Sequence, residues 1–176
     1  MSYDALAESL KLLGGSPPHD SARLSRRRRH VPLAVDRDDD VAATMFLRRS
    51  VSGLPVLEVH VLELTGGAWR MLGGGGGPGY EATEARLPLA DLGGPAVSHG
   101  GGGTARASRS WLRRDAWISW AELRLATEVS ALRVGTRLVP VVAHGSAVVV
   151  WTRKPPRVTA LDASGAVLGP ISVGRV

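Results

Sequence analysis

A histidine followed by four glycines stands in the stretch SHGGGGTARASRSW, which runs from Ser98 to Trp111. In one large class of esterases, a His-Gly-rich loop supplies backbone N–H groups that stabilise the oxyanion of the reaction. That chemistry also needs a nucleophilic serine in a G-x-S-x-G turn, with an acid and a histidine later in the chain. Ser52, Ser146 and Ser164 all lack this spacing. The sequence therefore predicts no catalytic residues of the serine-hydrolase type.

A second glycine run, in residues 73–79, contains the letters of the dinucleotide-binding pattern G-x-G-x-x-G. In that pattern the last glycine opens a helix whose N-terminus faces the phosphates, but here Pro78 interrupts the turn. We interpret residues 73–79 and residues 100–103 as glycine-rich loops between strands. Shortening the loop at 100–103 is expected to cost little stability.

Carboxylates at Asp36, Asp38 and Asp40 have the spacing that opens an EF-hand calcium loop. An EF-hand then needs glycine at its sixth position and glutamate at its twelfth, where this chain has Val41 and Leu47. The sequence therefore predicts no EF-hand. A weak calcium site between loops remains as an alternative.

The histidines are widely separated along the chain. They are His19, His30, His60, His99 and His144. Glu58 and His60 share one face of a predicted strand, but two ligands do not make a metal site without a third. No metal and no cofactor is therefore expected, although a ligand or metal site built from loops with His60, His99 or His144 stays open.

The strongest basic feature is a run of four arginines, Arg26, Arg27, Arg28 and Arg29. Arginines in a flexible arm would bind phosphate groups and release counterions, which gives salt-dependent binding without sequence preference. The acidic DRDDD segment at 36–40 follows closely and would compete for this arm. No aromatic residue lies among the arginines to stack on bases. Binding of a polyanion or nucleic acid is therefore an alternative function.

The N-terminal residues 1–15 predict one short amphipathic helix. Ala5, Leu6, Leu10 and Leu13 form an apolar stripe, and Gly14-Gly15 is a stop signal. A helix this short is marginal alone, so it must dock on its own domain or on a partner. Residues 16–30, which hold two prolines and the arginine run, predict a basic linker.

Residues 31–176 predict an all-β domain. About seven to nine short strands separated by turn signals, with no long helix between them, are typical of an antiparallel β-sandwich. We expect an immunoglobulin-like sandwich or a partly open barrel, preceded by the short α-helix. In the stretch WAELRLATEV, apolar and polar residues alternate, which predicts a strand with one face toward water.

Four tryptophans lie near the predicted strands of the second half of the chain. Trp151 follows a run of three valines and is expected in the core. Trp117 and Trp120 stand where a charged segment changes into a strand, so at least one of them is expected to be exposed. We therefore include both as partner-binding residues.

Composition limits the classes of protein. The chain has 176 residues, a net charge of +6 and no cysteine, which excludes disulfides, thiolate nucleophiles and cysteine-ligated metals. It has no signal-peptide pattern and no apolar run of the ~18 residues that a membrane span needs. The strong preference for arginine over lysine is typical of a GC-rich bacterial genome. We expect a soluble bacterial protein of the cytoplasm with no membrane partner.

No constellation of nucleophile, base and orienting group can be assembled from these motifs, so the sequence predicts that the protein is not an enzyme. The favoured function is a non-catalytic protein–protein interaction or assembly module of a cytoplasmic complex. Its partner-binding residues would be Leu6, Leu10 and Leu13 on the helix, with Trp117 and Trp120 on the sheet.

Overall fold

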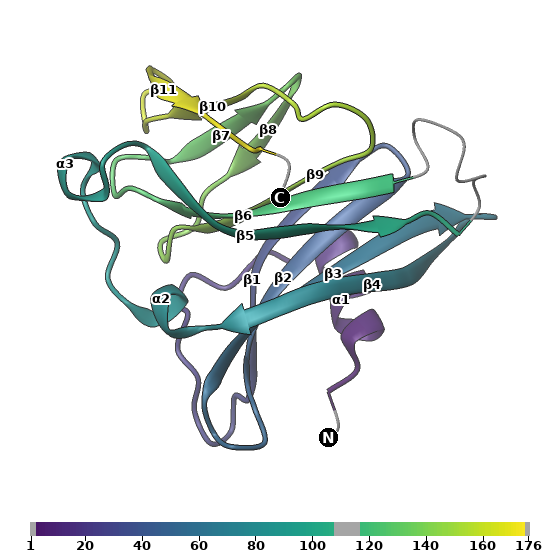
Figure 1. The fold of residues 1–176 in the computed structure, drawn as a ribbon. Coiled ribbons are helices and arrows are strands. Elements are labelled where there is room, and N and C mark those ends of the chain that lie inside the picture. Colours follow the sequence, from purple (N-terminus) through teal and green to yellow (C-terminus); the bar gives the residue numbers. More distant parts are fainter. Residues whose placement is uncertain (1–2, 108–116, 175–176) are drawn as a thin grey trace.

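The computed structural model describes residues 3–107 and 117–174. The prediction of an all-β sandwich with one short N-terminal helix is confirmed: the described strands form several antiparallel sheets and no closed barrel (Figure 1). The helix is α1 (Ala5–Leu13), and two single-turn helices follow later, α2 (Tyr80–Thr83) and α3 (Leu89–Leu92).

The strands form three sheets. The first sheet has the order β1-β2-β3-β4, with bounds β1 (His30–Asp38), β2 (Val41–Arg49), β3 (Pro55–Thr65) and β4 (Ala68–Pro78). The second sheet has the order β5-β6-β9, with bounds β5 (Ala96–Ala105), β6 (Trp117–Leu125) and β9 (Ser146–Trp151). The third sheet has the order β11-β10-β7-β8, with bounds β7 (Ala131–Val134), β8 (Arg137–Pro140), β10 (Val158–Leu161) and β11 (Val167–Ile171).

The second sheet lies between the other two, so β6 and β9 are buried on both faces (Figure 1). On β6, Ile118 and Trp120 pack against the first sheet, while Ala121 and Leu123 belong to a second core shared with the third sheet. The prediction that WAELRLATEV exposes one face to water is therefore wrong. The third sheet covers the apolar face of this strand, and the face that the alternation assigns to solvent is the Trp120 face, which lies toward the first sheet. The charged residues of that face, Glu122 and Arg124, are therefore buried as well.

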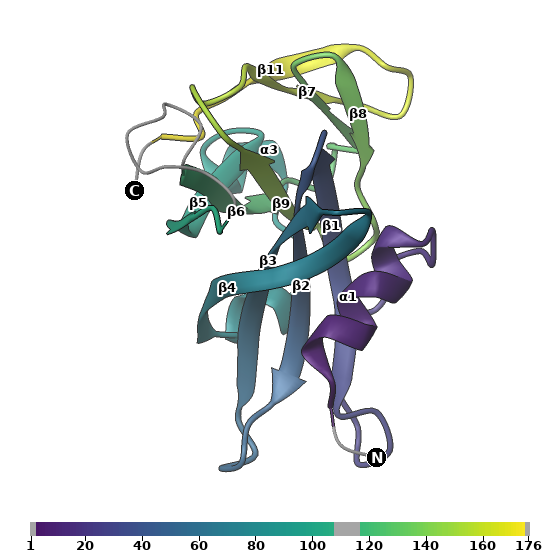
Figure 2. The same cartoon turned by 90° about the vertical axis from the view of Figure 1, so that its right-hand side faces the viewer.

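Helix α1 packs on the face of the first sheet that points away from the second sheet (Figure 2). Asp4 caps its start by accepting a hydrogen bond from the Ala7 N–H at 3.0 Å. Ser9 and Leu12 are the buried residues of the helix. The apolar stripe expected from the sequence is therefore split, because Leu6 and Leu10 are 36% and 39% exposed and the helix faces the sheet with a different edge.

Residues 16–30 are not a free linker, because they fold along the first sheet. The His19 N–H donates to the Pro32 carbonyl at 2.9 Å. Ala22 is buried in the core between the first and second sheets, and Leu24 packs against that core. The segment that carries the arginine run is therefore anchored to the domain.

Both glycine runs lie in strands, which corrects the prediction that residues 73–79 and 100–103 are loops. Gly73–Gly77 pair with β3, and Gly100–Gly103 pair with β6. These strands need glycine because side chains of β6 press against them: a β-carbon on Gly100 would lie 2.7 Å from the Glu122 carboxyl carbon. The glycines permit close approach of backbone to side chain, a role that composition does not distinguish from loop flexibility.

Candidate functional site

The arginine run forms a compact loop at one end of the first sheet. The Ser25 N–H donates to the Arg28 carbonyl, and the Arg28 N–H donates back to Ser25 Oγ, both at 2.9 Å. The Arg49 N–H at the end of β2 donates to the Arg29 carbonyl at 2.9 Å. These bonds fix the backbone and leave the side chains of Arg23, Arg26, Arg27, Arg28 and Arg29 exposed. We call residues 23–29 the arginine loop.

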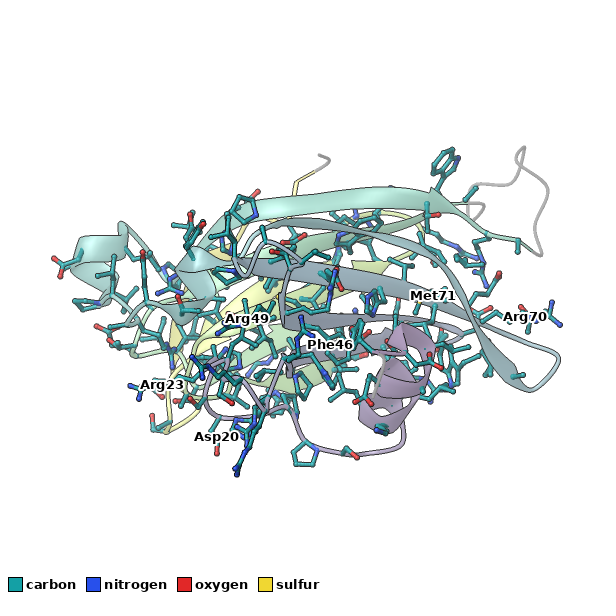
Figure 3. The ribbon with its side chains drawn as sticks, turned by 90° about the horizontal axis from the view of Figure 1, so that it is seen from below. Asp20, Arg23, Phe46, Arg49, Arg70 and Met71 are labelled. Carbon is teal, nitrogen blue, oxygen red and sulfur yellow. The ribbon has the colours of Figure 1, made fainter. Side chains whose placement is uncertain are left out.

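An open pocket of about 1200 Å³ lies along this loop. Its wall comprises the five arginines of the loop together with His19 and His30, and no carboxylate lines it. Figure 3 shows the molecule from below and labels Arg23 together with Asp20, which precedes it in the same segment. The pocket is therefore a basic surface with room for a ligand larger than a single ion.

The guanidinium groups of the arginine loop form no ion pair with any carboxylate in residues 3–107 and 117–174. Elsewhere in the fold, arginine side chains bind carboxylates or backbone carbonyls; among them are Arg37, Arg48, Arg86, Arg106, Arg124 and Arg137. These hydrogen bonds tie the arginines outside the loop into the fold and stabilise it. The arginines of the loop form no such bond within the described residues, so their donors stay available to a ligand, apart from the one that Arg28 shares with His19.

One guanidinium of the loop is oriented by a histidine. Arg28 Nη1 donates to His19 Nε2 at 2.7 Å. His19 Nδ1 lies 3.1 Å from both the N–H and the carbonyl oxygen of Ser21, so the backbone of residue 21 orients the ring. His19 therefore holds Arg28 in place at the wall of the pocket.

The acidic segment expected to compete for the arginines is bound elsewhere. Asp36 and Asp38 accept hydrogen bonds from Arg137 at 2.8 Å, and Asp40 pairs with Arg106. Strand β1 separates them from the arginine loop by eight residue steps, roughly 25 Å. This arrangement gives the aspartates a structural role, and it leaves the arginine loop free of them.

The residues predicted to bind a partner are not brought together. Leu6 and Leu10 are exposed on α1, with Leu13 half-buried beside them. Trp117 is 56% exposed at the start of β6, in a different layer, where it lines a small pocket of about 210 Å³. Trp120 is only 4% exposed and lies in the core, so it cannot act as an exposed partner-binding platform.

The sequence motifs did not reveal a buried cluster of serine, histidine and glutamate under α1. Ser9 Oγ lies 3.2 Å from His60 Nδ1, and Glu58 Oε2 lies 3.8 Å from His60 Nε2. Ser9 also shares a hydrogen bond of 2.8 Å with Thr44, and it is 0% exposed. Burial lowers the pKa of His60 below its ordinary value, an effect that Glu58 opposes. No substrate reaches this hydroxyl beneath the helix, so the cluster joins α1 to the sheet.

The other histidines of the loop-site alternative lie apart from His60. His99 Nδ1 on β5 is 2.5 Å from Glu81 Oε2, and His144 is buried in the turn before β9. Burial raises the pKa of Glu122 near His99, although the charge on His99 opposes this shift. Within the described residues, no group of three or more histidine or acidic side chains has the arrangement of a metal site.

Comparison of the chain with protein-family models, curated proteins and solved structures gives no match. In residues 3–107 and 117–174, no helix has the length and apolar character needed to cross a membrane. The geometry of the described residues is therefore the basis for inferring a function.

Proposed function

We propose that the protein is a non-catalytic binding module that holds an anionic partner on its arginine loop. The observation that carries this proposal is the set of five exposed arginines around one open pocket, without a carboxylate in its wall. Each guanidinium presents several N–H donors in a planar fork that matches phosphate, sulfate or carboxylate oxygens. A fixed loop of five such groups favours a ligand with several negative charges.

The fold also supports the arginine loop over α1 as the binding element. An amphipathic helix needs a partner when its own domain offers no surface to cover its apolar face. Helix α1 already buries Leu12 and Ser9 on its own sheet. Its remaining apolar surface is small: Leu6 and Leu10 are partly exposed and Leu13 is half-buried. The arginine loop, in contrast, concentrates guanidinium groups that form no ion pair with a carboxylate of the described residues. The net charge of +6 adds a long-range attraction for anionic partners.

Heparin-affinity chromatography tests the proposal, with heparin as a probe of sulfated polyanion character. The variant carries Arg26→Ala, Arg27→Ala, Arg28→Ala and Arg29→Ala. A matched control carries Arg133→Ala, Arg153→Ala, Lys154→Ala and Arg157→Ala, which removes four exposed basic residues of the second half of the chain. Both variants lose the same formal charge, so the comparison separates the loop from net charge.

We expect the loop variant to elute at much lower salt than the native protein, and the control variant to shift only slightly. The dependence of affinity on salt should also be weaker for the loop variant, because fewer counterions are released when it binds. Equal shifts in the two variants would show that binding depends on net charge and would contradict the proposal. Failure of the native protein to bind at low salt would contradict it as well.

A further inference from the structure

The turn between β2 and β3 presents two apolar side chains to solvent. Val51 is 102% exposed and Leu54 is 51% exposed. They belong to residues 50–54, which we call the hairpin tip. Isolated apolar residues on a surface are common, but both of these stand at the end of one hairpin.

The hairpin tip is internally hydrogen-bonded. The Ser50 N–H donates to the Leu54 carbonyl at 2.8 Å, and the Gly53 N–H donates to the Ser50 carbonyl at 3.1 Å. Ser50 Oγ accepts from the Leu54 N–H at 3.1 Å and shares a hydrogen bond of 2.8 Å with Ser52 Oγ. Gly53 has φ +89°, which suits glycine and closes the turn. A turn with these polar groups already paired can enter a less polar medium at lower cost.

The hairpin tip and the arginine loop lie at the same end of the molecule. His30, which follows the loop, pairs with Arg48 near the end of β2, and Arg49 donates to the Arg29 carbonyl. In Figures 1 and 2, the β2–β3 turn and the loop that leads into β1 project together at the bottom of the view. One surface can therefore meet the arginines and the two apolar side chains together.

We infer that the anionic partner is the surface of a bilayer that contains anionic lipids. The arginine loop binds the headgroup phosphates and the hairpin tip places Val51 and Leu54 among the headgroups and upper acyl chains. This inference rests on the proposed function, because it names the partner of the same basic site. Basic residues near an anionic leaflet and apolar side chains at its interface both favour binding, and a stable attachment needs both signals.

The apolar tip favours a bilayer over a nucleic acid. A phosphodiester backbone gives an exposed valine and leucine no apolar medium to enter. Single-stranded nucleic acids are bound through aromatic side chains on which bases stack, and neither the arginine loop nor the hairpin tip contains an aromatic residue. The sequence-based expectation of no membrane partner rests on the lack of an apolar run long enough to span a bilayer. Attachment at the surface of a bilayer needs no such run.

Vesicle co-sedimentation tests the inference with two kinds of vesicle, phosphatidylcholine alone and phosphatidylcholine mixed with phosphatidylglycerol. The tip variant carries Val51→Ser and Leu54→Ser. Its matched control carries Leu138→Ser and Val167→Ser, which replaces two apolar residues that are 64% and 61% exposed on the third sheet. Heparin affinity and binding of a mixed-sequence oligonucleotide are measured for the same proteins.

We expect the native protein and the control to bind the anionic vesicles and not the phosphatidylcholine vesicles. The tip variant should bind the anionic vesicles roughly tenfold more weakly while its heparin affinity stays unchanged, since only the apolar contribution is lost. The variant with four alanines in the arginine loop should lose both kinds of binding.

Three results would overturn the inference. Heparin or oligonucleotide binding without vesicle binding would leave the proposed function in place and remove the bilayer as the partner. Equal vesicle binding by the native protein and the tip variant would show that Val51 and Leu54 do not enter the bilayer. Absence of binding to heparin, oligonucleotide and vesicles would overturn the inference together with the proposed function.

Discussion

The indole ring of Trp120 lies against the backbone of Gly102, so that a β-carbon on Gly102 would come within 2.6 Å of the ring. The ring also approaches the first sheet, where a β-carbon on Gly75 would lie 3.2 Å from it. Trp120 therefore occupies the space between β4 and β5, and glycine on both strands makes that space available. The two glycine runs are part of the packing between the first and second sheets.

Gly102→Ala is expected to lower the free energy of unfolding by about 1–3 kcal/mol, because the added methyl group forces the Trp120 ring or β5 to move. Urea denaturation followed by tryptophan fluorescence measures this change. Gly77→Ala is the control, since a β-carbon there meets nothing within 4 Å. That variant should stay within about 0.5 kcal/mol of the native protein. Similar losses in both variants would contradict the close-packing role of Gly102.

The sequence predicted those parts of the fold that depend on local signals. Two consecutive glycines are a local signal for a tight turn, and Gly66 and Gly67 join β3 and β4 with φ of +61° and +79°. Positive φ at both central residues is what this kind of hairpin turn requires, and glycine adopts it without strain. The Asp162–Gly165 turn forms likewise, with the Gly165 N–H donating to the Asp162 carbonyl at 3.0 Å.

Features that depend on contacts distant in sequence were not predicted. The glycines at 100–103 have the same composition as a loop, and only the positions of Trp120 and Glu122 on the neighbouring strand show why glycine is needed there. The arginine run was identified, but its anchoring through Arg29 and Arg49 depends on where β2 ends. The exposure of Val51 beside that loop is likewise a property of the assembled sheet.

Leu12→Ala should destabilise the protein by about 2–4 kcal/mol, because Leu12 is the buried leucine that packs α1 on the first sheet. Leu10→Ala removes the same atoms from a side chain that is 39% exposed, so its loss should stay below about 1 kcal/mol. Thermal unfolding followed by circular dichroism compares the two. If Leu10→Ala were the more damaging change, α1 would face the sheet with the opposite edge.

Arg137→Ala should cost about 3–5 kcal/mol, because it leaves the buried Asp36 carboxylate without its charge partner. Arg137 Nε and Nη2 bind the two oxygens of Asp36 at 2.8 Å each, and the Asp36 side chain is 1% exposed. Asp36 also accepts from the Val150 N–H at 2.9 Å, so this pair joins all three sheets. Arg133→Ala, at an exposed position on β7, is the control and should be nearly neutral in urea denaturation. A small effect of Arg137→Ala would show that the three sheets stay together without this pair.

Stability should fall as the pH falls from 7 to 5, in part because of His144. Burial lowers the pKa of His144 from 6.5 to about 4, and the Arg86 charge acts in the same direction. His144 Nδ1 accepts a hydrogen bond from the Ser146 N–H, so the neutral ring carries its proton on Nε2 and a second proton would have to enter at Nδ1, at the expense of that bond. As the pH falls below 6.5 the unfolded chain takes up this proton before the folded protein does, so acid favours unfolding.

The loss assigned to His144 is about 2 kcal/mol at pH 5, and it approaches about 3 kcal/mol as the pH reaches the folded-state pKa. His144→Asn can keep an acceptor for the Ser146 N–H, which donates to His144 Nδ1 at 3.0 Å, but it does not titrate. Urea midpoints measured from pH 7.5 to pH 5 should therefore fall less steeply for His144→Asn than for the native protein. Part of the pH dependence that remains in the variant comes from His60, because burial lowers the pKa of His60 as well. Parallel slopes in the two proteins would show that His144 takes up its proton equally in the folded and unfolded states, against the burial that the structure shows.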